Sequence, residues 1–221
     1  MTEEHLAVLR RHMVELIDIH YDLASEEIGK DSLDEPVREA MLRAPRHIFV
    51  PEQLAAFAYH DRPLPIGFDK TISQPFIGAL MLDLLDVERD QKILEVGTGL
   101  GYQAALLAEM GARLWSVEIV EEFASAAGAR LAALGMQDVV LRSGDGSRGW
   151  PDKAPFDRIL VTAAAAEPPE PLIDQLADEG RMVIPLGGGD VQQLSVLSKN
   201  GAGETETRAV LPVRFTMLEV A

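Results

Sequence analysis

Residues on one helical face recur at intervals of three and four near the start of the chain, at Leu6, Leu9, Met13, Leu16, Ile17 and His20. This spacing predicts an amphipathic helix whose charged residues lie on the opposite face. A second helix is predicted to begin near Asp34, with Pro36 in its first turn, and to end before Pro45, because the residue preceding a proline avoids the helical conformation. We expect both helices to serve packing.

Prolines and a glycine at short intervals interrupt residues 46–70. The pattern allows one short helix near Leu54–Tyr59 and predicts otherwise irregular chain. Long loops of this kind often carry function. Within it, we expect Tyr59 to be buried and Asp61 to lie in an exposed polar turn.

From Ser73 onward, short hydrophobic runs alternate with helical patterns. The runs predict strands at Ile93–Val96, Leu114–Val117, Val139–Leu141, Ile159–Val161 and Met182–Pro185. The intervening patterns predict helices at Tyr102–Met110, at Glu121–Leu134 with Gly135 as its stop, and at Pro168–Leu176. Strands that alternate with helices predict right-handed βαβ units, and therefore a parallel sheet covered by helices on both faces.

The last part of the chain has a different pattern. Gln193–Ser198, a turn at Asn200-Gly201 and Thr205–Phe215 predict an antiparallel strand pair at one sheet edge. The predicted fold class is therefore α/β, a Rossmann-like, doubly wound, mostly parallel sheet with an antiparallel C-terminal pair. The 221 residues contain no repeat or linker, so we predict a single domain, residues 1–221.

Charge and composition exclude several classes of protein. With 36 acidic and 20 basic residues, a formal net charge of -16 and no basic cluster, the chain would repel DNA or RNA. It has no cysteine, and its five histidines show no ligand spacing, so no metal site is predicted. Neither a signal peptide nor a membrane span is visible, and we expect a soluble, cytoplasmic protein with no membrane partner.

A glycine-rich loop follows the first strand of the predicted sheet, in the run from Glu95 to Gly101. Its spacing is Gly-x-Gly-x-Gly, whereas the dinucleotide pattern requires glycine at the position of Tyr102. An acid beside a pyrophosphate would be repulsive, but beside a sulfonium or amino-acid cation it is attractive. The loop therefore favours S-adenosylmethionine over a nicotinamide, and a purely structural glycine turn is the alternative.

Two further acids follow predicted strands. Glu118 comes after the second strand, where a carboxylate can accept hydrogen bonds from both hydroxyls of a ribose; the alternative is a solvated acid at a helix start. Asp145, between Gly144 and Gly146, follows the third strand and can accept from an adenine amine, although an ordinary turn would have the same residues. Together with the glycine loop, the binding interpretation is preferred.

Several motifs resemble those of one family. They are Arg46-His47-Ile48-Phe49-Val50-Pro51, Leu64-Pro65-Ile66-Gly67, Thr71-Ile72-Ser73-Gln74-Pro75, Glu95 to Gln103, Gly144-Asp145-Gly146 with Gly149-Trp150-Pro151, Val161-Thr162-Ala163-Ala164 and Gly180 to Pro185. From Arg46 to Phe215 the chain resembles the protein-L-isoaspartate O-methyltransferases, also called protein repair methyltransferases. The Thr-Ile-Ser-Gln-Pro stretch is the most specific of these motifs.

The resemblance implies methyl transfer from S-adenosylmethionine to the free α-carboxylate of L-isoaspartyl residues in damaged proteins and peptides, leaving S-adenosylhomocysteine. The ester would then close to a succinimide. The family's active-site serine falls on Ser73. Cofactor-binding residues are expected at Ser73, Gln74, Pro75, Phe76, Glu95, Gly97, Gly99, Gly101, Glu118, Asp145, Gly146 and Thr216, and substrate-binding residues at Ile66, Thr71, Ile72, Ser73, Arg214 and Phe215.

The resemblance also divides the predicted domain into an N-terminal helical segment (1–45), an active-site segment (46–91) and a cofactor-binding core with C-terminal strands (92–221). Isoaspartyl proteins and peptides are the implied partners, and a monomer is expected. One departure is that family members commonly carry Gly-Gln where this chain has Asp69-Lys70. That departure keeps open a different carboxylate acceptor, a small molecule or a specific modified peptide. A catalytically silent cofactor-binding module is a third hypothesis.

The chemistry is consistent with these residues. A carboxylate is already ionised at neutral pH, so its attack on a sulfonium methyl needs no strong general base. Catalysis would come mainly from alignment of the reacting atoms, and the Ser73 hydroxyl would orient the acceptor. From its position alone, Ser73 is better explained as the N-cap of the helix that follows, with Pro75 in the first turn, and it is the resemblance that favours the active-site role.

Overall fold

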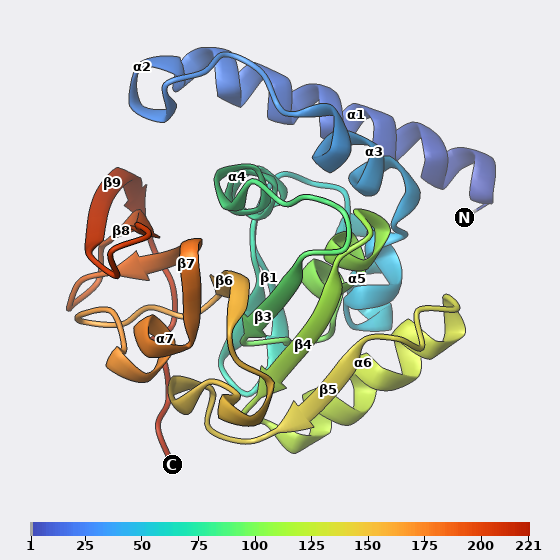
Figure 1. Cartoon of the computed structure of the whole chain (residues 1–221). Coiled ribbons are helices and arrows are strands. Elements are labelled where there is room, and N and C mark those ends of the chain that lie inside the picture. The colour runs from blue at the N-terminus through green and yellow to red at the C-terminus, as the bar shows by residue number, and fades with distance from the viewer. Residues whose placement is uncertain (1) are drawn as a thin grey trace.

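The computed structural model describes residues 2–221. Its N-terminal region contains the helices α1 (Glu3–Leu23), α2 (Ser25–Ile28) and α3 (Glu35–Arg43). The two predicted helices are confirmed, because α3 has Asp34 at its N-cap and ends before Pro45, while the short α2 was not predicted. Figure 1 shows α1 and α3 lying across the top of the molecule, above α4 (Pro75–Leu85).

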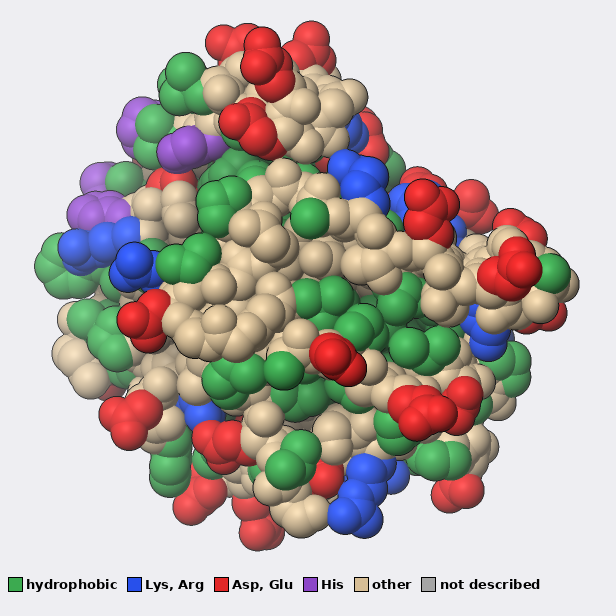
Figure 2. All heavy atoms as spheres, turned by 90° about the vertical axis from the view of Figure 1, so that its left-hand side faces the viewer, with side chains coloured by type: hydrophobic (Ala, Val, Ile, Leu, Met, Phe, Trp, Pro, Cys, Tyr) green, Lys and Arg blue, Asp and Glu red, His purple; other side chains and the backbone are tan. Residues whose placement is uncertain are grey.

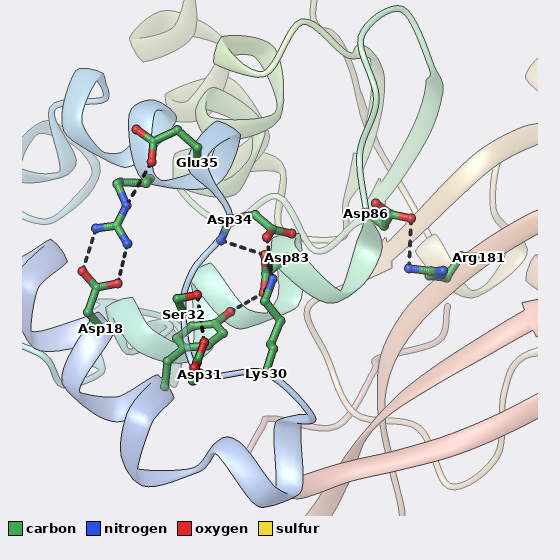
Figure 3. Close-up of polar contacts among 11 residues, drawn as sticks. Asp18, Lys30, Asp31, Ser32, Asp34, Glu35, Asp83, Asp86 and Arg181 are labelled. Atoms are coloured by element: carbon green, nitrogen blue, oxygen red, sulfur yellow. Dashed lines mark hydrogen bonds and ion pairs between the residues drawn. The ribbon is translucent and has the colours of Figure 1, made fainter.

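A buried carboxylate ties these N-terminal helices to α4. Asp83 of α4 accepts hydrogen bonds from the Tyr21 hydroxyl at 2.7 Å, the Lys30 ammonium at 3.1 Å and the Asp34 backbone N–H at 3.2 Å (Figure 3). Burial and the adjacent Asp83 raise the pKa of Tyr21, so that its phenol stays a donor. Because the three donors come from α1, from the loop that follows α2 and from the N-cap of α3, this cluster fixes how the N-terminal helices sit on α4.

The centre of the fold is a seven-stranded sheet with strand order β5-β4-β3-β6-β7-β8-β9. The strands are β3 (Lys92–Val96), β4 (Arg113–Glu118), β5 (Val140–Ser143), β6 (Phe156–Val161), β7 (Leu176–Leu186), β8 (Gln192–Lys199) and β9 (Thr205–Val213). The first five pair in parallel, and β8 and β9 are antiparallel. The predicted parallel sheet and its antiparallel C-terminal pair are therefore confirmed.

Successive residues of a strand point to opposite faces of the sheet, and each face has its own hydrophobic cluster. On β3, Ile93 packs in the cluster that includes residues of α4 and α5 (Tyr102–Glu109) and Leu131 of α6 (Glu121–Ala133). Its neighbour Leu94 packs in the cluster that includes Leu172 of α7 (Glu170–Gln175). Helices thus cover both faces, as the doubly wound prediction requires (Figure 1).

The segment before α4 is more regular than predicted. Two 3-10 helices, η1 (Arg46–Phe49) and η2 (Glu52–Phe57), lead into an antiparallel hairpin of β1 (Leu64–Gly67) and β2 (Lys70–Ile72). The prediction of irregular chain was wrong at the hairpin. Its alternating buried and exposed residues were hidden by prolines, and its turn residues Phe68 and Asp69 adopt φ of 49° and 54° without the usual Asn-Gly sequence.

Candidate active site

The strand order reverses at β3. The next two strands in sequence, β4 and β5, are added on one side of β3, whereas β6 and β7 are added on the other side. In open parallel sheets, ligands bind beyond the carboxyl ends of the strands at such a point. The glycine loop follows β3, and Thr162 follows β6. The Thr162 hydroxyl donates to the Gly97 carbonyl at 2.6 Å.

Close packing between these two strand ends explains the first glycine of the loop. Gly97 has a φ of 93°, and a Cβ there would lie 2.3 Å from the Thr162 hydroxyl oxygen. Gly99, with a φ of 56°, meets only the Ile66 side chain at 3.5 Å. Any side chain at position 97 would therefore displace the Thr162 side chain and its hydrogen bond to Gly97, which is a packing requirement that the motif alone did not reveal.

Glu118 lies at the carboxyl end of β4 and holds the glycine loop in place. One carboxylate oxygen accepts from the Gly99 N–H at 2.7 Å, and the other accepts from the Val120 N–H at 2.9 Å. Each oxygen keeps a second lone pair. The Glu118 side chain also lines the pocket, so it can accept hydrogen bonds from two neighbouring hydroxyls of a ligand.

Glu95 is placed differently from the prediction. Its side chain is fully buried beneath the loop, where it accepts from the Ser116 hydroxyl at 2.5 Å, and its other oxygen has no hydrogen-bond partner. Burial raises the pKa of Glu95 to about 8, the Glu118 charge adds to this, and the Ser116 hydrogen bond partly opposes it. At neutral pH it is mostly an uncharged acid outside the pocket wall, so the expected charge attraction to a cationic ligand is not supported.

Asp145 is also drawn away from the pocket wall. One carboxylate oxygen accepts from the Ser147 N–H at 2.9 Å, and the other accepts from the Ala221 N–H at 3.2 Å. Its neighbour Gly146 does line the pocket, and a Cβ there would lie 2.5 Å from a Val96 methyl group. The Ser147 hydroxyl and the Arg148 guanidinium also contact these two oxygens, so the expected contact of Asp145 with an adenine amine would require one of these contacts to open.

Ser73 lies between β2 and α4, half-buried on the pocket wall. The N-cap of α4 is Gln74, with Pro75 in the first turn, and no Ser73 side-chain hydrogen bond to another described residue is present. The interpretation of Ser73 as the N-cap is therefore wrong. Because Ser73 lines the pocket and its hydroxyl has no partner within the described residues, this hydroxyl is free to contact a ligand.

Two residues that sequence reasoning undervalued hold Ser73 in position. Arg46 is buried and donates to the backbone carbonyl of Ser73 at 2.7 Å. Asp61 accepts from the backbone N–H of Phe76 at 2.9 Å and from the Gln74 amide at 2.7 Å, so it caps α4 from a distant segment. With only 7% of its side chain exposed, Asp61 is not part of an exposed turn as expected.

The N-terminal helices also reach this cap. His20 of α1 lies 3.3 Å from the Asp61 carboxylate, and its ring stacks on Phe76 with a centroid distance of 4.9 Å. Tyr59 is buried as expected, and its hydroxyl lies 2.9 Å from a ring nitrogen of His47. The first 45 residues, expected only to pack, therefore also support the segment that follows Ser73.

The tail (residues 214–221) crosses the carboxyl end of β6. The Thr216 carbonyl accepts from the Ala164 N–H at 2.8 Å, and the Leu218 N–H donates to the Ala164 carbonyl at 2.7 Å. The tail thereby adds to the pocket wall, as does the β1–β2 hairpin, which it contacts through Lys70 and Glu219.

These segments enclose a pocket of about 480 Å³, a volume in the range of sites for small molecules and cofactors. Predicted site residues on its wall are Ile66, Thr71, Ser73, Gln74, Gly97, Gly99, Glu118, Gly146, Arg214, Phe215 and Thr216. The structure does not bring Ile72, Pro75, Phe76, Glu95, Gly101 or Asp145 to that wall. Gly101 instead caps α5, with a φ of 99°, and Phe76 packs beneath Ser73 in the core.

Other kinds of site find no support in residues 2–221. No group of three or more histidine, aspartate or glutamate side chains is arranged to hold a metal ion there. Over the same residues, no helix has both the length and the hydrophobicity needed to cross a membrane.

The pocket belongs to a fold that comparison with known proteins identifies. The family model described as protein-L-isoaspartate(D-aspartate) O-methyltransferase matches residues 20–220. The chain belongs to this family. It is 52% identical, over 95% of its length and 85% of the relative's, to protein-L-isoaspartate O-methyltransferase 2 of Syntrophobacter fumaroxidans. Over its whole length it is 48% identical to protein-L-isoaspartate O-methyltransferase 1 of a Polaromonas species, 94% of which is covered.

Solved structures of family members share the architecture. A protein-L-isoaspartate O-methyltransferase superposes with a TM-score of 0.79 at 25% identity, covering 94% of this chain and 65% of that one. A Plasmodium falciparum relative, solved with S-adenosyl-L-homocysteine, superposes with a TM-score of 0.72 at 24% identity, covering 84% of this chain and 91% of that one. The predicted fold class, family and methyltransferase class are thus confirmed.

Proposed function

We propose that this chain transfers a methyl group from S-adenosylmethionine to the free α-carboxylate of L-isoaspartyl residues in damaged proteins and peptides, the activity named by its family. The observation that carries this proposal is the position of Ser73. Ser73 lines the same pocket as Gly97, Gly99 and Glu118, and its hydroxyl has no hydrogen-bond partner among residues 2–221. Donor and acceptor could therefore meet in one cavity.

The strand-end side of the pocket fits the donor. Gly97 and Gly99 expose backbone at the wall, and Glu118 offers free lone pairs for ribose hydroxyls while its N–H contacts hold it rigid. When bound, S-adenosylmethionine supplies an electrophilic methyl group on a positively charged sulfur. An anionic carboxylate at the wall favours that charge. Thr216, on the tail, also lines the pocket.

The hairpin side fits the acceptor. An isoaspartyl α-carboxylate is already ionised at neutral pH, so no residue needs to remove a proton. Taking it out of water is unfavourable, and the Ser73 hydroxyl can donate a hydrogen bond that offsets part of this cost. Arg46 and Asp61 fix the backbone at Ser73 and at the start of the helix that follows it. Positioning of this kind can lower a barrier by roughly 7 to 11 kcal/mol at most.

The decisive test uses two peptides that are identical except for one linkage, isoaspartyl in one and aspartyl in the other. The purified chain is incubated with each peptide and methyl-labelled S-adenosylmethionine. We expect base-labile label only in the isoaspartyl peptide. Equal labelling of both peptides, or none, would contradict the proposal.

A different carboxylate acceptor is the competing proposal, and it rests on one observation. Lys70, which replaces the glutamine common in the family, contacts Glu219 of the tail at the pocket wall. Turnover with a small carboxylate or a modified peptide, but not with the isoaspartyl peptide, would favour this alternative. A cytoplasmic location, a monomeric state, an absence of nucleic-acid partners and the division at residues 45 and 91 remain predictions.

A further inference from the structure

The balance of acidic and basic side chains on the pocket wall differs from that of the whole molecule. The chain carries a formal net charge of -16, and Figure 2 shows acidic side chains spread over the face it presents, with Lys and Arg scattered among them. The pocket, by contrast, is lined by two cations, Lys70 and Arg214, and two acids, Glu118 and Glu219. These four charges balance, so the pocket wall lacks the acidic excess of the molecule as a whole, and its two cations lie on the hairpin and the tail.

Lys70 is held by a rigid element. It belongs to β2, three positions before Ser73, and it pairs with Gly67 of β1 across the hairpin. Only 21% of its side chain is exposed, and its ammonium forms an ion pair with the Glu219 carboxylate. A cation on a short strand beside the proposed acceptor site can therefore contact a substrate without moving the backbone.

Glu219 is presented by a less buried segment. The tail is anchored at Ala164 through Thr216 and Leu218, but Glu219 itself has 54% of its side chain exposed. Exposed ion pairs contribute little to stability, typically below about 1 kcal/mol. The Glu219 carboxylate is therefore paired with the Lys70 ammonium at the pocket wall, but another anion could displace it at little cost in free energy.

Arg214 provides a second cation on the same wall. Its side chain is exposed, and it forms no ion pair with another residue in the described range 2–221. An unpaired guanidinium and a weakly paired ammonium facing one cavity make up a surface that attracts anions.

We propose that Lys70, assisted by Arg214, selects isoaspartyl substrates that carry an acidic residue next to the damaged residue. This inference rests on the proposed function. In it, Glu219 is an internal stand-in for the acidic side chain of the substrate, and binding replaces the Lys70–Glu219 pair by a Lys70–substrate pair. This exchange replaces one ion pair with another, so binding of an acidic substrate leaves Lys70 paired. A basic side chain placed there would instead be repelled by Lys70 and Arg214.

The test uses isoaspartyl peptides that differ at one neighbouring position, with glutamate, glutamine or lysine there. One series varies the preceding residue, and another varies the following residue. We expect the protein to show its highest kcat/KM for the glutamate peptide and its lowest for the lysine peptide in at least one series. The ratio between the two should fall as salt is raised, because the contact is electrostatic.

Three variants locate the effect. Lys70→Gln should reduce the glutamate-to-lysine ratio of kcat/KM about fivefold, whereas Glu219→Gln should raise kcat/KM for the glutamate peptide about twofold by removing the competitor. Lys153→Gln is the matched control, because Lys153 is an exposed cation that does not line the pocket. It should leave the ratio unchanged.

Two failures can be told apart. If no isoaspartyl peptide is methylated, the proposed function itself fails. If all are methylated but the ratio is the same in the unaltered protein and in Lys70→Gln, the selectivity inference is overturned while the function stands. Equal melting temperatures of the variants would show that a changed ratio does not arise from unfolding.

Discussion

The two sides of the pocket are built in different ways. On the strand-end side, Glu118 bonds Gly99 at 2.7 Å, and Gly97 packs against Thr162, so neighbouring loops of one sheet hold each other rigidly. On the hairpin side, Lys70 meets Glu219, which lies 149 residues away in sequence, and Asp61 caps a helix from a separate segment. The first side is held together by neighbouring strand ends, and the second by segments far apart in the sequence.

From this difference we expect cofactor binding on the strand-end side and substrate selectivity on the hairpin side. A pocket wall whose polar groups are already paired with backbone can hold a constant ligand without rearrangement, which suits a cofactor. A wall made of a hairpin and an exposed tail can vary its charges without disturbing the sheet, which suits a substrate-recognition surface. Substitutions on the two sides should therefore separate cofactor affinity from turnover.

The largest effect is expected on the strand-end side, from Glu118→Ala. This change removes the acceptor for two backbone N–H groups and any hydrogen bond to the cofactor. Hydrogen bonds to a charged group contribute roughly 1.5 to 3 kcal/mol, so S-adenosylhomocysteine should bind about 100-fold more weakly by calorimetry. The exposed Glu122→Ala is the control. If Glu118→Ala changed the affinity for S-adenosylhomocysteine less than about threefold, the strand-end side would not be the main cofactor-binding side.

On the hairpin side, Ser73→Ala should reduce kcat about 10- to 100-fold, because the acceptor loses its orienting hydroxyl. The affinity for S-adenosylhomocysteine should change little. The melting temperature should also hold, since Gln74 and not Ser73 is the N-cap of α4. A lower melting temperature of Ser73→Ala with an unchanged kcat would show that Ser73 has a structural role instead.

A smaller effect is expected from Asp61→Ala, which leaves the Phe76 N–H without its acceptor. Loss of a helix cap lowers the free energy of unfolding by about 1 kcal/mol, or roughly 2 to 4 °C in melting temperature for a chain of this size. We also expect kcat to fall about tenfold with KM less affected. Normal kcat in a destabilised variant would show that Asp61 stabilises α4 without positioning Ser73.

The smallest effect concerns Glu95 and pH. Burial raises its pKa in the folded protein to about 8, above the ordinary 4.5, so the folded state binds the proton more tightly than the unfolded chain. The resulting stability is fully present below about pH 4.5 and is lost as pH rises toward about 8. The Glu95→Gln variant cannot ionise there, so its melting temperature should fall less than that of the unaltered protein between those pH values. If the melting temperatures of the variant and of the unaltered protein changed equally with pH, the conclusion that Glu95 is neutral would be contradicted.

Periodicity was enough to predict the sheet, because the residues that set each strand lie next to one another in sequence. Ile93 and Leu94 already indicate a strand buried on both faces. The same reasoning failed for the hairpin, where Pro65 and Gly67 hide the alternation, and for Glu95, whose burial depends on Ser116 in the neighbouring strand.

The candidate site was predictable to a similar extent. The motif around Ser73 indicates a residue worth attention, but the sequence alone could not separate an N-cap from a pocket residue. That distinction depends on Asp61, which supplies the cap from outside the helix. Likewise, Lys70 is an ordinary surface cation in the sequence, and only the folded tail brings Glu219 to it.

The central claim is that one cavity holds the methyl donor against the strand ends and the acceptor against Ser73. A crystal structure of the protein with S-adenosylhomocysteine and an isoaspartyl peptide tests it most directly. The account predicts the ribose of S-adenosylhomocysteine on Glu118 and the peptide α-carboxylate within hydrogen-bond distance of the Ser73 hydroxyl. Cofactor density away from Gly97 and Glu118, or a peptide carboxylate that does not approach Ser73, would contradict it.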